Sequence, residues 1–314
     1  MDDGLAAVMA IGLGGLLAAI GAVRLSGANP SLAFARARFS WLAGSGLRAV
    51  GSRGLGRILA LCAPALVFAI GSAASGAPAA AVGTALGLLT ATTFLAALLI
   101  ASEAPERGSG AHGYAMALVF AAVVLFAVAF DGRIGSGEGV AMLACAGLVA
   151  WRLPPVASAL HDRPGSGRAW LWVGAGSVAV LGGAWLAIFG ARTLMIGRPD
   201  GDLMAGLCGL GPAAAAPLIW RAWRGRESGE GGTAFREIVA ALALCLFAML
   251  GLAALVRPLP VPDSFLRAPL IGLSLSAAVM LWLTIGRRPV PRSAPAVGLI
   301  VYLALFVAYL KVAA

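Results

Sequence analysis

The chain has 314 residues, 61% of them hydrophobic and 11% charged, with a mean hydropathy of +0.94 and a formal net charge of +10. Soluble proteins carry about one charged residue in four, so this composition excludes a cytosolic enzyme, a disordered chain, a collagen and a small disulfide scaffold. It predicts an integral membrane protein whose principal partner is the lipid bilayer. The arginines lie between apolar runs, which indicates orientation in the bilayer rather than a nucleic-acid partner.

Long apolar runs predict an all-α fold with about ten transmembrane helices. Their approximate limits are 4–23, 58–76, 80–101, 111–130, 138–157, 169–190, 202–220, 234–256, 265–286 and 294–313. The first run follows Met1-Asp2-Asp3, which lacks the basic start of a cleavable signal. We therefore expect this run to remain as a helix.

Basic residues divide unevenly between the two sides of these helices, with 17 on one side and 6 on the other. The positive-inside rule places the richer side in the cytoplasm and both termini on the non-cytoplasmic side, and we expect a bacterial inner membrane. The longest connection, 25–57, lies on the richer side, and one helical stripe of apolar residues predicts an interfacial helix on anionic lipid. That stripe consists of Leu32, Ala35, Phe39 and Leu42.

The ten helices divide into two sets of five at the polar stretch 161–168. This division predicts a first repeat over 1–161, which includes the interfacial segment 25–57, and a second repeat over 168–314. An odd number of helices in each set requires the second set to enter the membrane upside down. Inverted repeats are typical of secondary transporters, which bind their substrate near the middle of the membrane at the repeat interface.

A proline lies at a corresponding place in each set. Pro64 lies inside the second helix and Pro212 inside the seventh, and each removes a backbone hydrogen bond. Thr84 follows the first proline by 20 residues, and Thr233 follows the second by 21. Helix interruptions at corresponding places in the two halves point to a transport pathway, although proline is also common in membrane helices without such a role.

Short motifs near these prolines resemble those of the cation/calcium antiporter superfamily, which includes the sodium/calcium exchangers. The stretch 62–66, Cys-Ala-Pro-Ala-Leu, is similar to the family's Ser-x-Pro-Glu-Leu, and the stretch 80–88 is similar to its Gly-Asn-x-x-Gly motif at Gly83 and Gly87. The stretch 131–139 is similar to the end of a family repeat. The resemblance implies ten helices in two inverted five-helix repeats, with both termini outside the cytoplasm.

The chain departs from the family at the positions that hold the cation. Ala65 and Ala213 stand where the family has glutamate, and Thr92 and Ala241 stand where its third and eighth helices have asparagine or aspartate. Glu237 stands at a serine position one turn earlier. Calcium takes about six to eight oxygen ligands, several of them anionic, so we do not expect ordinary calcium/sodium exchange, a metal site or a cofactor.

One acidic side chain, Glu237, lies within the body of a predicted helix. There it would carry a proton or pair with a cationic substrate. The alternative, which we favour from the sequence, is that Arg236 and Glu237 mark the cytoplasmic end of the helix and extend to water.

Threonines form a hydroxyl cluster on the third helix, at Thr84, Thr90, Thr92 and Thr93. Thr90 and Thr93 share one face, where neutral oxygens would line a pathway for a weakly solvated ion or a small solute. The alternative, which is more common, is that each hydroxyl donates to its own helix backbone.

Nothing in the sequence combines a nucleophile with a base, forms a phosphate loop or clusters metal ligands, so we do not expect an enzyme. The four cysteines lie in apolar runs without metal or redox spacing, and we expect them only to pack. They are Cys62, Cys145, Cys208 and Cys245.

The sequence therefore favours a secondary transporter of sodium/calcium exchanger type with a degenerate ion site, which moves protons, a monovalent cation or a small solute. Its pathway candidates are Pro64, Thr84, Thr90, Thr92, Pro212, Thr233 and Glu237. A second hypothesis is a non-transporting membrane subunit or scaffold, with 25–57 as the surface for a membrane protein partner. A third is a drug/metabolite-type exporter, whose cytoplasmic termini disagree with the arginine distribution.

Overall fold

The computed structural model describes residues 2–27, 52–102, 112–151, 169–195, 200–262, 268–285 and 290–313. Almost all of them are helical. The first half forms α1 (Asp2–Gly27), α3 (Ser52–Ala74), α4 (Pro78–Ala91), the π-helix η3 (Thr92–Ala97), α5 (Leu98–Ala101), α6 (His112–Asp131) and α7 (Ser136–Trp151). The second half forms α8 (Ala169–Met195), α9 (Gly201–Met204), the π-helix η4 (Ala205–Leu210), α10 (Gly211–Glu227), α11 (Gly231–Val256), α12 (Ala268–Ile285) and α13 (Ala294–Ala313).

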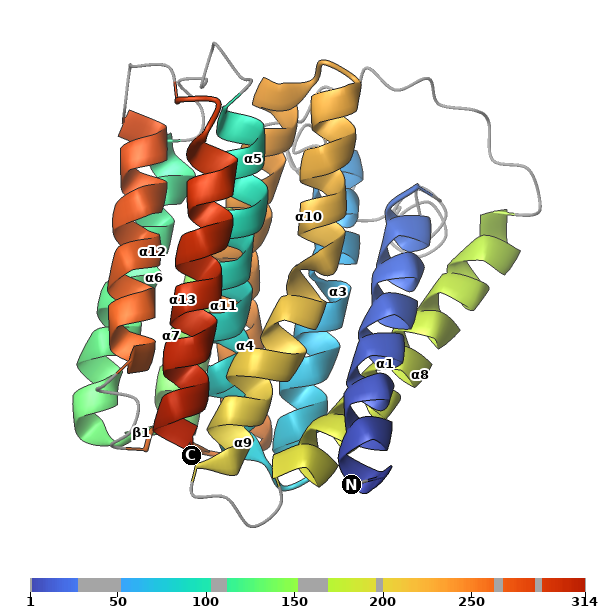
Figure 1. Ribbon diagram of the computed structural model, residues 1–314, viewed down its shortest axis with the longest axis vertical. Coiled ribbons are helices and arrows are strands. Elements are labelled where there is room, and N and C mark those ends of the chain that lie inside the picture. Colours follow the sequence, from blue (N-terminus) through green and yellow to red (C-terminus); the bar gives the residue numbers. More distant parts are fainter. Residues whose placement is uncertain are drawn as a thin grey trace, which may run out of the picture.

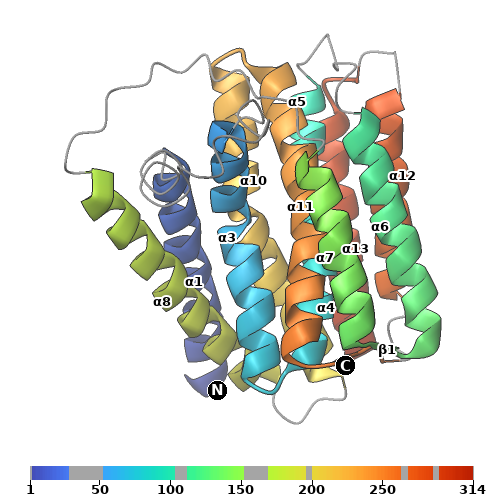
Figure 2. The same ribbon diagram turned by 180° about the vertical axis from the view of Figure 1, so that it is seen from behind.

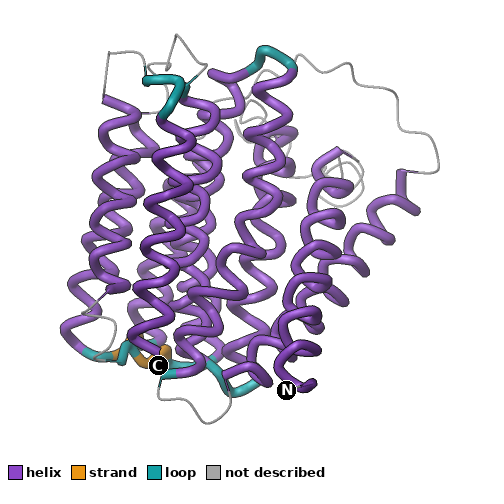
Figure 3. Tube along the Cα trace, in the orientation of Figure 1, coloured by secondary structure: helices purple, strands orange, loops and turns teal. Residues whose placement is uncertain are grey.

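Because α4, η3 and α5 are continuous, as are α9, η4 and α10, the described residues form ten helical rods. Six of the rods are long and apolar enough to cross a membrane, and the other four contain shorter apolar helices. Figures 1 and 3 show the rods standing side by side in one bundle. The prediction of an all-α integral membrane fold with about ten transmembrane helices is confirmed.

The predicted spans coincide with the rods, but several ends differ. α3 begins at Ser52, α10 continues to Glu227, and α11 begins at Gly231. The extensions of α3 and α10 contain charged residues and that of α11 is Gly-Gly-Thr, which a search for apolar runs leaves out. The predicted interfacial helix and the predicted boundary at 161–168 lie outside the described residues.

The start of α1 and the end of α13 lie at the same end of the bundle, at the bottom of Figure 1. Two short strands lie at that end as well (Figure 3). Here β1 (Arg133–Ile134), between α6 and α7, pairs antiparallel with β2 (Leu259–Pro260), which follows α11. The pairing ties a connection of the first half to one of the second. The sequence did not predict it, because two-residue strands leave no periodic signal.

Helices α1 and α8 pack antiparallel along one edge of the bundle, as both views show (Figures 1 and 2). A Cβ atom at Gly14 would lie 2.5 Å from the carbonyl oxygen of Gly183, and one at Gly21 would lie 2.6 Å from that of Gly176. The close contacts recur every seven residues on both helices. Glycines at these places let the two backbones touch, which is the usual way for membrane helices to associate.

The centre of the bundle consists of two helices from each half, α3 and α4 with α10 and α11. Every residue of α4 from Ala80 to Ala91 is buried. A Cβ atom at Gly87 would meet the carbonyl oxygen of Leu207, and one at Gly206 would meet that of Ala80. The backbones of α4 and the α9–η4–α10 rod are thus in direct contact, and no large side chain fits between them at these points.

We expect Gly14→Ala to destabilise the folded chain by about 1–3 kcal/mol, because the added methyl group forces α1 and α8 apart. The measurement is the Tm of the purified full chain in detergent micelles. Gly12→Ala is the matched control, since nothing lies within 4 Å of a Cβ atom built there. Equal Tm values for the two variants would contradict the packing of α1 on α8.

Candidate functional site

The two proline positions lie on corresponding rods of the central helices but differ in their effect. Pro64 lies inside α3, which continues as a single α-helix to Ala74. Pro212 is the second residue of α10, which directly follows η4. Proline cannot donate to the carbonyl group four residues earlier, and the change to π-helical bonding lies where that bond is lost. Of Pro64 and Pro212, therefore, only Pro212 lies beside an interruption of regular α-helix.

The four positions at which the motif resemblance implied lost ligands are buried or half-buried. Ala65 is 1% exposed, Thr92 and Ala241 are fully buried, and Ala213 is half-buried. The sulfur of Cys62 on α3 lies 3.4 Å from the carbonyl oxygen of Ala241 on α11. The first and second halves of the chain therefore meet where Cys62 contacts Ala241.

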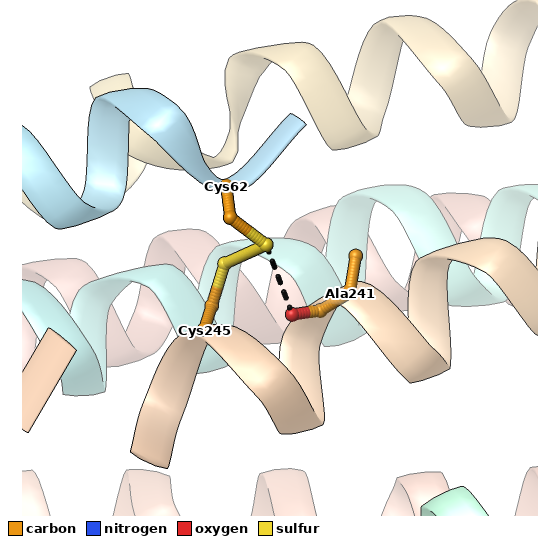
Figure 4. Close-up of a disulfide and its surroundings, with 3 residues drawn as sticks. All are labelled: Cys62, Ala241 and Cys245. Atoms are coloured by element: carbon orange, nitrogen blue, oxygen red, sulfur yellow. Dashed lines mark hydrogen bonds between the residues drawn. A yellow bond between two sulfur atoms is a disulfide. The ribbon is translucent and has the colours of Figure 1, made fainter. Parts of the chain in front are cut away.

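A disulfide joins Cys62 of α3 to Cys245 of α11 at this place, with the two Cα atoms 5.6 Å apart (Figure 4). The expectation that all four cysteines only pack is wrong for this pair, while Cys145 and Cys208 are free. The sequence contains no local signal for the pairing, because 183 residues separate the two cysteines. A disulfide sulfur has no hydrogen to donate, so the contact with Ala241 becomes a hydrogen bond only when Cys62 is a thiol.

Glu237 is at the centre of a group of charged side chains between α3, α10 and α11. Its carboxylate accepts a hydrogen bond from Arg221 Nε at 2.5 Å and lies 3.5 Å from Arg57 Nη1. Arg221 Nη2 also lies 3.7 Å from the carboxylate of Glu230. Glu237 is 2% exposed and Arg221 is 6% exposed, so the core of this group is shielded from solvent. Coulomb attraction is strong at such a site, and it offsets part of the desolvation cost of the charges.

The interpretation that Glu237 extends to water beside Arg236 is therefore wrong. Because α11 begins at Gly231, Glu237 lies almost two turns inside the helix and faces the bundle, while Arg236 is exposed. The contribution of Arg221 was missed because the predicted seventh span ends at 220. The longer α10 keeps Arg221 helical and directs it at α11. Both residues were misplaced because the helices that carry them are longer than the predicted spans.

The threonine candidates differ in their hydrogen bonds. Thr84 donates to the carbonyl oxygen of Ala80 at 2.7 Å, and Thr90 donates to that of Leu86 at 2.9 Å, as the alternative interpretation expected. The hydroxyl of Thr92 is buried without a hydrogen-bond partner. Thr233 lies half-buried in the first turn of α11, one turn before Glu237. Among the described residues, no hydrogen bond joins these threonines to Glu237.

The described part of the core offers little else for binding. It contains no group of three or more His, Cys, Asp or Glu side chains placed to hold a metal ion. A cavity beside α4 is lined only by apolar side chains, among them Leu86, Met142 and Leu246. Polar chemistry in this region therefore depends on the Glu237 group and on buried hydroxyls.

The disulfide predicts a simple labelling result. Alkylation of the unfolded, unreduced full chain should modify two cysteines, because Cys145 and Cys208 are the free pair, and prior reduction should raise this to four. Intact mass spectrometry counts the labels. The double variant Cys62→Ser/Cys245→Ser is the control and should take two labels with or without reduction. Four labels on the unreduced wild-type chain would show that Cys62 and Cys245 are thiols.

Solved structures with the same architecture are known, although no protein-family model and no curated protein matches the chain. The sodium-calcium exchanger NCX_Mj, soaked with 100 mM Na+ and 10 mM Sr2+, superposes with a TM-score of 0.57 at 16% identity over 98% of both chains. The H+/Ca2+ exchanger CAX superposes with a TM-score of 0.54 at 14% identity, over 98% of this chain and 89% of the other. The resemblance indicated by the short motifs is confirmed at the level of architecture: the chain shares the fold of these two exchangers.

Proposed function

We propose that the chain is an exchanger-type secondary transporter whose ion site is rebuilt around Glu237, and that it couples a proton to a monovalent cation or a small solute. The observation that supports this most directly is the burial of a single carboxylate between two arginines. The antiporter fold supports an exchange mechanism. It also supports a role in transport rather than catalysis.

Calcium is not the cargo in this proposal. A calcium ion needs several anionic oxygens within about 2.3–2.6 Å. The family's ligand positions here carry Ala65, Ala213 and Ala241, which supply no side-chain oxygen. Glu237 is the one acidic residue among the described buried side chains; Arg221 donates a hydrogen bond to its Oε2, and Arg57 Nη1 lies 3.5 Å from its Oε1. A divalent cation would have to displace them.

A proton changes the contacts of this group in a way that a transporter can use. Protonation of Glu237 removes the charge that holds Arg221 and Arg57, while Arg221 keeps Glu230 as an alternative partner. Since Glu237 is on α11, Arg57 on α3 and Arg221 on α10, loss of these pairs loosens α11 from both neighbours. Proton binding is thereby linked to the packing of the helices around the site.

The proposed setting follows from the arginine distribution. We place the protein in a bacterial inner membrane, with both termini on the non-cytoplasmic side and the Glu237 group toward the cytoplasmic end. The repeats extend over 1–161 and 168–314, with 25–57 on the cytoplasmic lipid surface. A drug/metabolite-type exporter would instead have cytoplasmic termini, which a reporter fused to either terminus would detect.

A second candidate function is a non-transporting membrane subunit that uses the transporter fold. The disulfide between Cys62 and Cys245 supports it, because a covalent link between the two halves limits their relative movement. The backbone contacts at Gly87 and Gly206 support it as well, because they leave no space between α4 and the opposite rod. In this case a membrane protein partner would copurify with the chain.

The test is proton movement in proteoliposomes that contain the purified full chain and an internal pH dye. A sodium or potassium gradient should drive proton movement in the wild type, whereas a calcium gradient should not. Glu237→Gln should lower the rate about tenfold or more, because it removes the proton-binding group. Glu227→Gln, an exposed residue at the end of α10, is the matched control and should retain the rate.

Two results would count against this assignment. An unchanged rate in Glu237→Gln would remove this side chain from the mechanism. Absence of flux for every cation gradient, together with a stable copurifying membrane protein, would favour the non-transporting subunit.

A further inference from the structure

Besides Thr92, three hydroxyl groups among the described residues are buried without a hydrogen-bond partner. They belong to Thr93 of η3, Ser276 of α12 and Tyr309 of α13, which are at most 2% exposed. Other hydroxyls in the bundle donate to their own helix, such as Thr284, whose oxygen lies 2.9 Å from the carbonyl oxygen of Met280. A buried polar group without a partner is costly and is usually satisfied by an ordered water or ion.

The three side chains come from elements that meet in one place. Both α12 and α13 contact η3, and α12 also contacts α4. The Tyr309 hydroxyl occupies the space above Gly272, where a Cβ atom would clash with it, and the methyl group of Thr90 lies 3.4 Å from the same point. Tyr309 therefore reaches the contact between α4 and α12.

Two further hydroxyls lie about one helical turn from this contact, one on α12 and one on the α4–η3 rod. Ser276 lies four residues after Gly272 on the buried face of α12, and Thr93 lies three residues after Thr90. The π-helix begins at Thr92, and the amide of Leu98 donates to the carbonyl oxygen of Thr93, five residues back. This altered bonding distinguishes η3 from the α-helix before it, and single-turn π-helices are frequent at functional sites.

We infer that Thr93, Ser276 and Tyr309 form a binding site for a monovalent alkali cation between η3, α12 and α13. Hydroxyl oxygens are hard, neutral donors, which suit a weakly charged hard cation. In other membrane proteins, neutral backbone carbonyl oxygens of selectivity filters and interrupted helices hold potassium or sodium. A divalent ion would need anionic ligands, and none of the three residues supplies one. Glu237 and the arginines lie on other helices and take no part in this site.

The cation site does not depend on the proposed role of Glu237, because an ion can be bound here whether or not a proton is transported. The test therefore measures binding by the purified full chain in detergent. Choline chloride is replaced stepwise by sodium chloride at constant ionic strength, and the Tm is followed. Sodium should raise the Tm saturably, since a ligand that binds only the folded state stabilises it.

Two variants and one control locate the effect. Ser276→Ala and Tyr309→Phe should each weaken the apparent sodium affinity about tenfold or more, and Tyr309→Phe preserves the shape of the side chain. Thr284→Ala, on the same helix, is the control and should respond as the wild type does, because its hydroxyl is already bonded to α12.

The possible outcomes separate this site from the proton proposal. A sodium response that survives Glu237→Gln but is lost in Ser276→Ala and Tyr309→Phe supports the site. No sodium response, or an equal response in both variants and the wild type, would show that the hydroxyls hold water only. A response lost in Glu237→Gln alone would place the cation at Glu237 and overturn this inference. A proton flux sensitive to Glu237 with no sodium response would remove the cation site and leave the proposed function intact.

Discussion

The ion pair between Arg221 and Glu237 is the interaction on which the centre of this molecule depends. A carboxylate among transmembrane helices is unfavourable unless opposite charge and hydrogen bonds accompany it. Here Arg221 supplies both from α10, and Arg57 adds a second positive charge from α3. The three helices that carry these side chains come from both halves of the fold, so one group of charges holds the halves together. The surrounding residues can then be apolar, as Ala65 and Ala241 are.

Close backbone contacts complete this arrangement. Glycines bring α1 against α8 and α4 against the α9–η4–α10 rod, so these helices pack through main-chain atoms. Lipid tails are as apolar as leucine, so hydrophobic burial contributes little to the association of membrane helices. In this chain the helices are held together by contacts between small residues, by the Cys62–Cys245 link and by the charged group around Glu237. The fold shared with the two exchangers is thus maintained around a core whose buried side chains, among the described residues, include a single carboxylate.

The sequence predicted the features that depend on long apolar runs, and it missed those that depend on where a helix stops. All ten rods were expected, and the antiporter architecture followed from their number and from the short motifs. Arg221 and Glu237 were assigned to helix ends because α10 continues through charged residues and α11 begins with Gly-Gly-Thr, and neither stretch has the hydropathy of a membrane span. The disulfide depends on the register between α3 and α11, which residues 183 positions apart do not reveal. The buried hydroxyl of Tyr309 was likewise invisible, because tyrosine near the end of a span normally indicates an interface anchor.

A double-mutant cycle on Arg221 and Glu237 tests the central claim most directly. The Tm and the free energy of unfolding would be measured for Arg221→Met, Glu237→Gln and the double variant, with exposed Arg224→Met as the control. Breaking a buried pair by removing one partner is expected to cost about 3–5 kcal/mol, because it leaves an uncompensated charge. Our account predicts that each single variant is strongly destabilised and that the double variant loses much less than their sum. Additive losses, or single variants as stable as Arg224→Met, would show that the two side chains do not neutralise each other in the membrane.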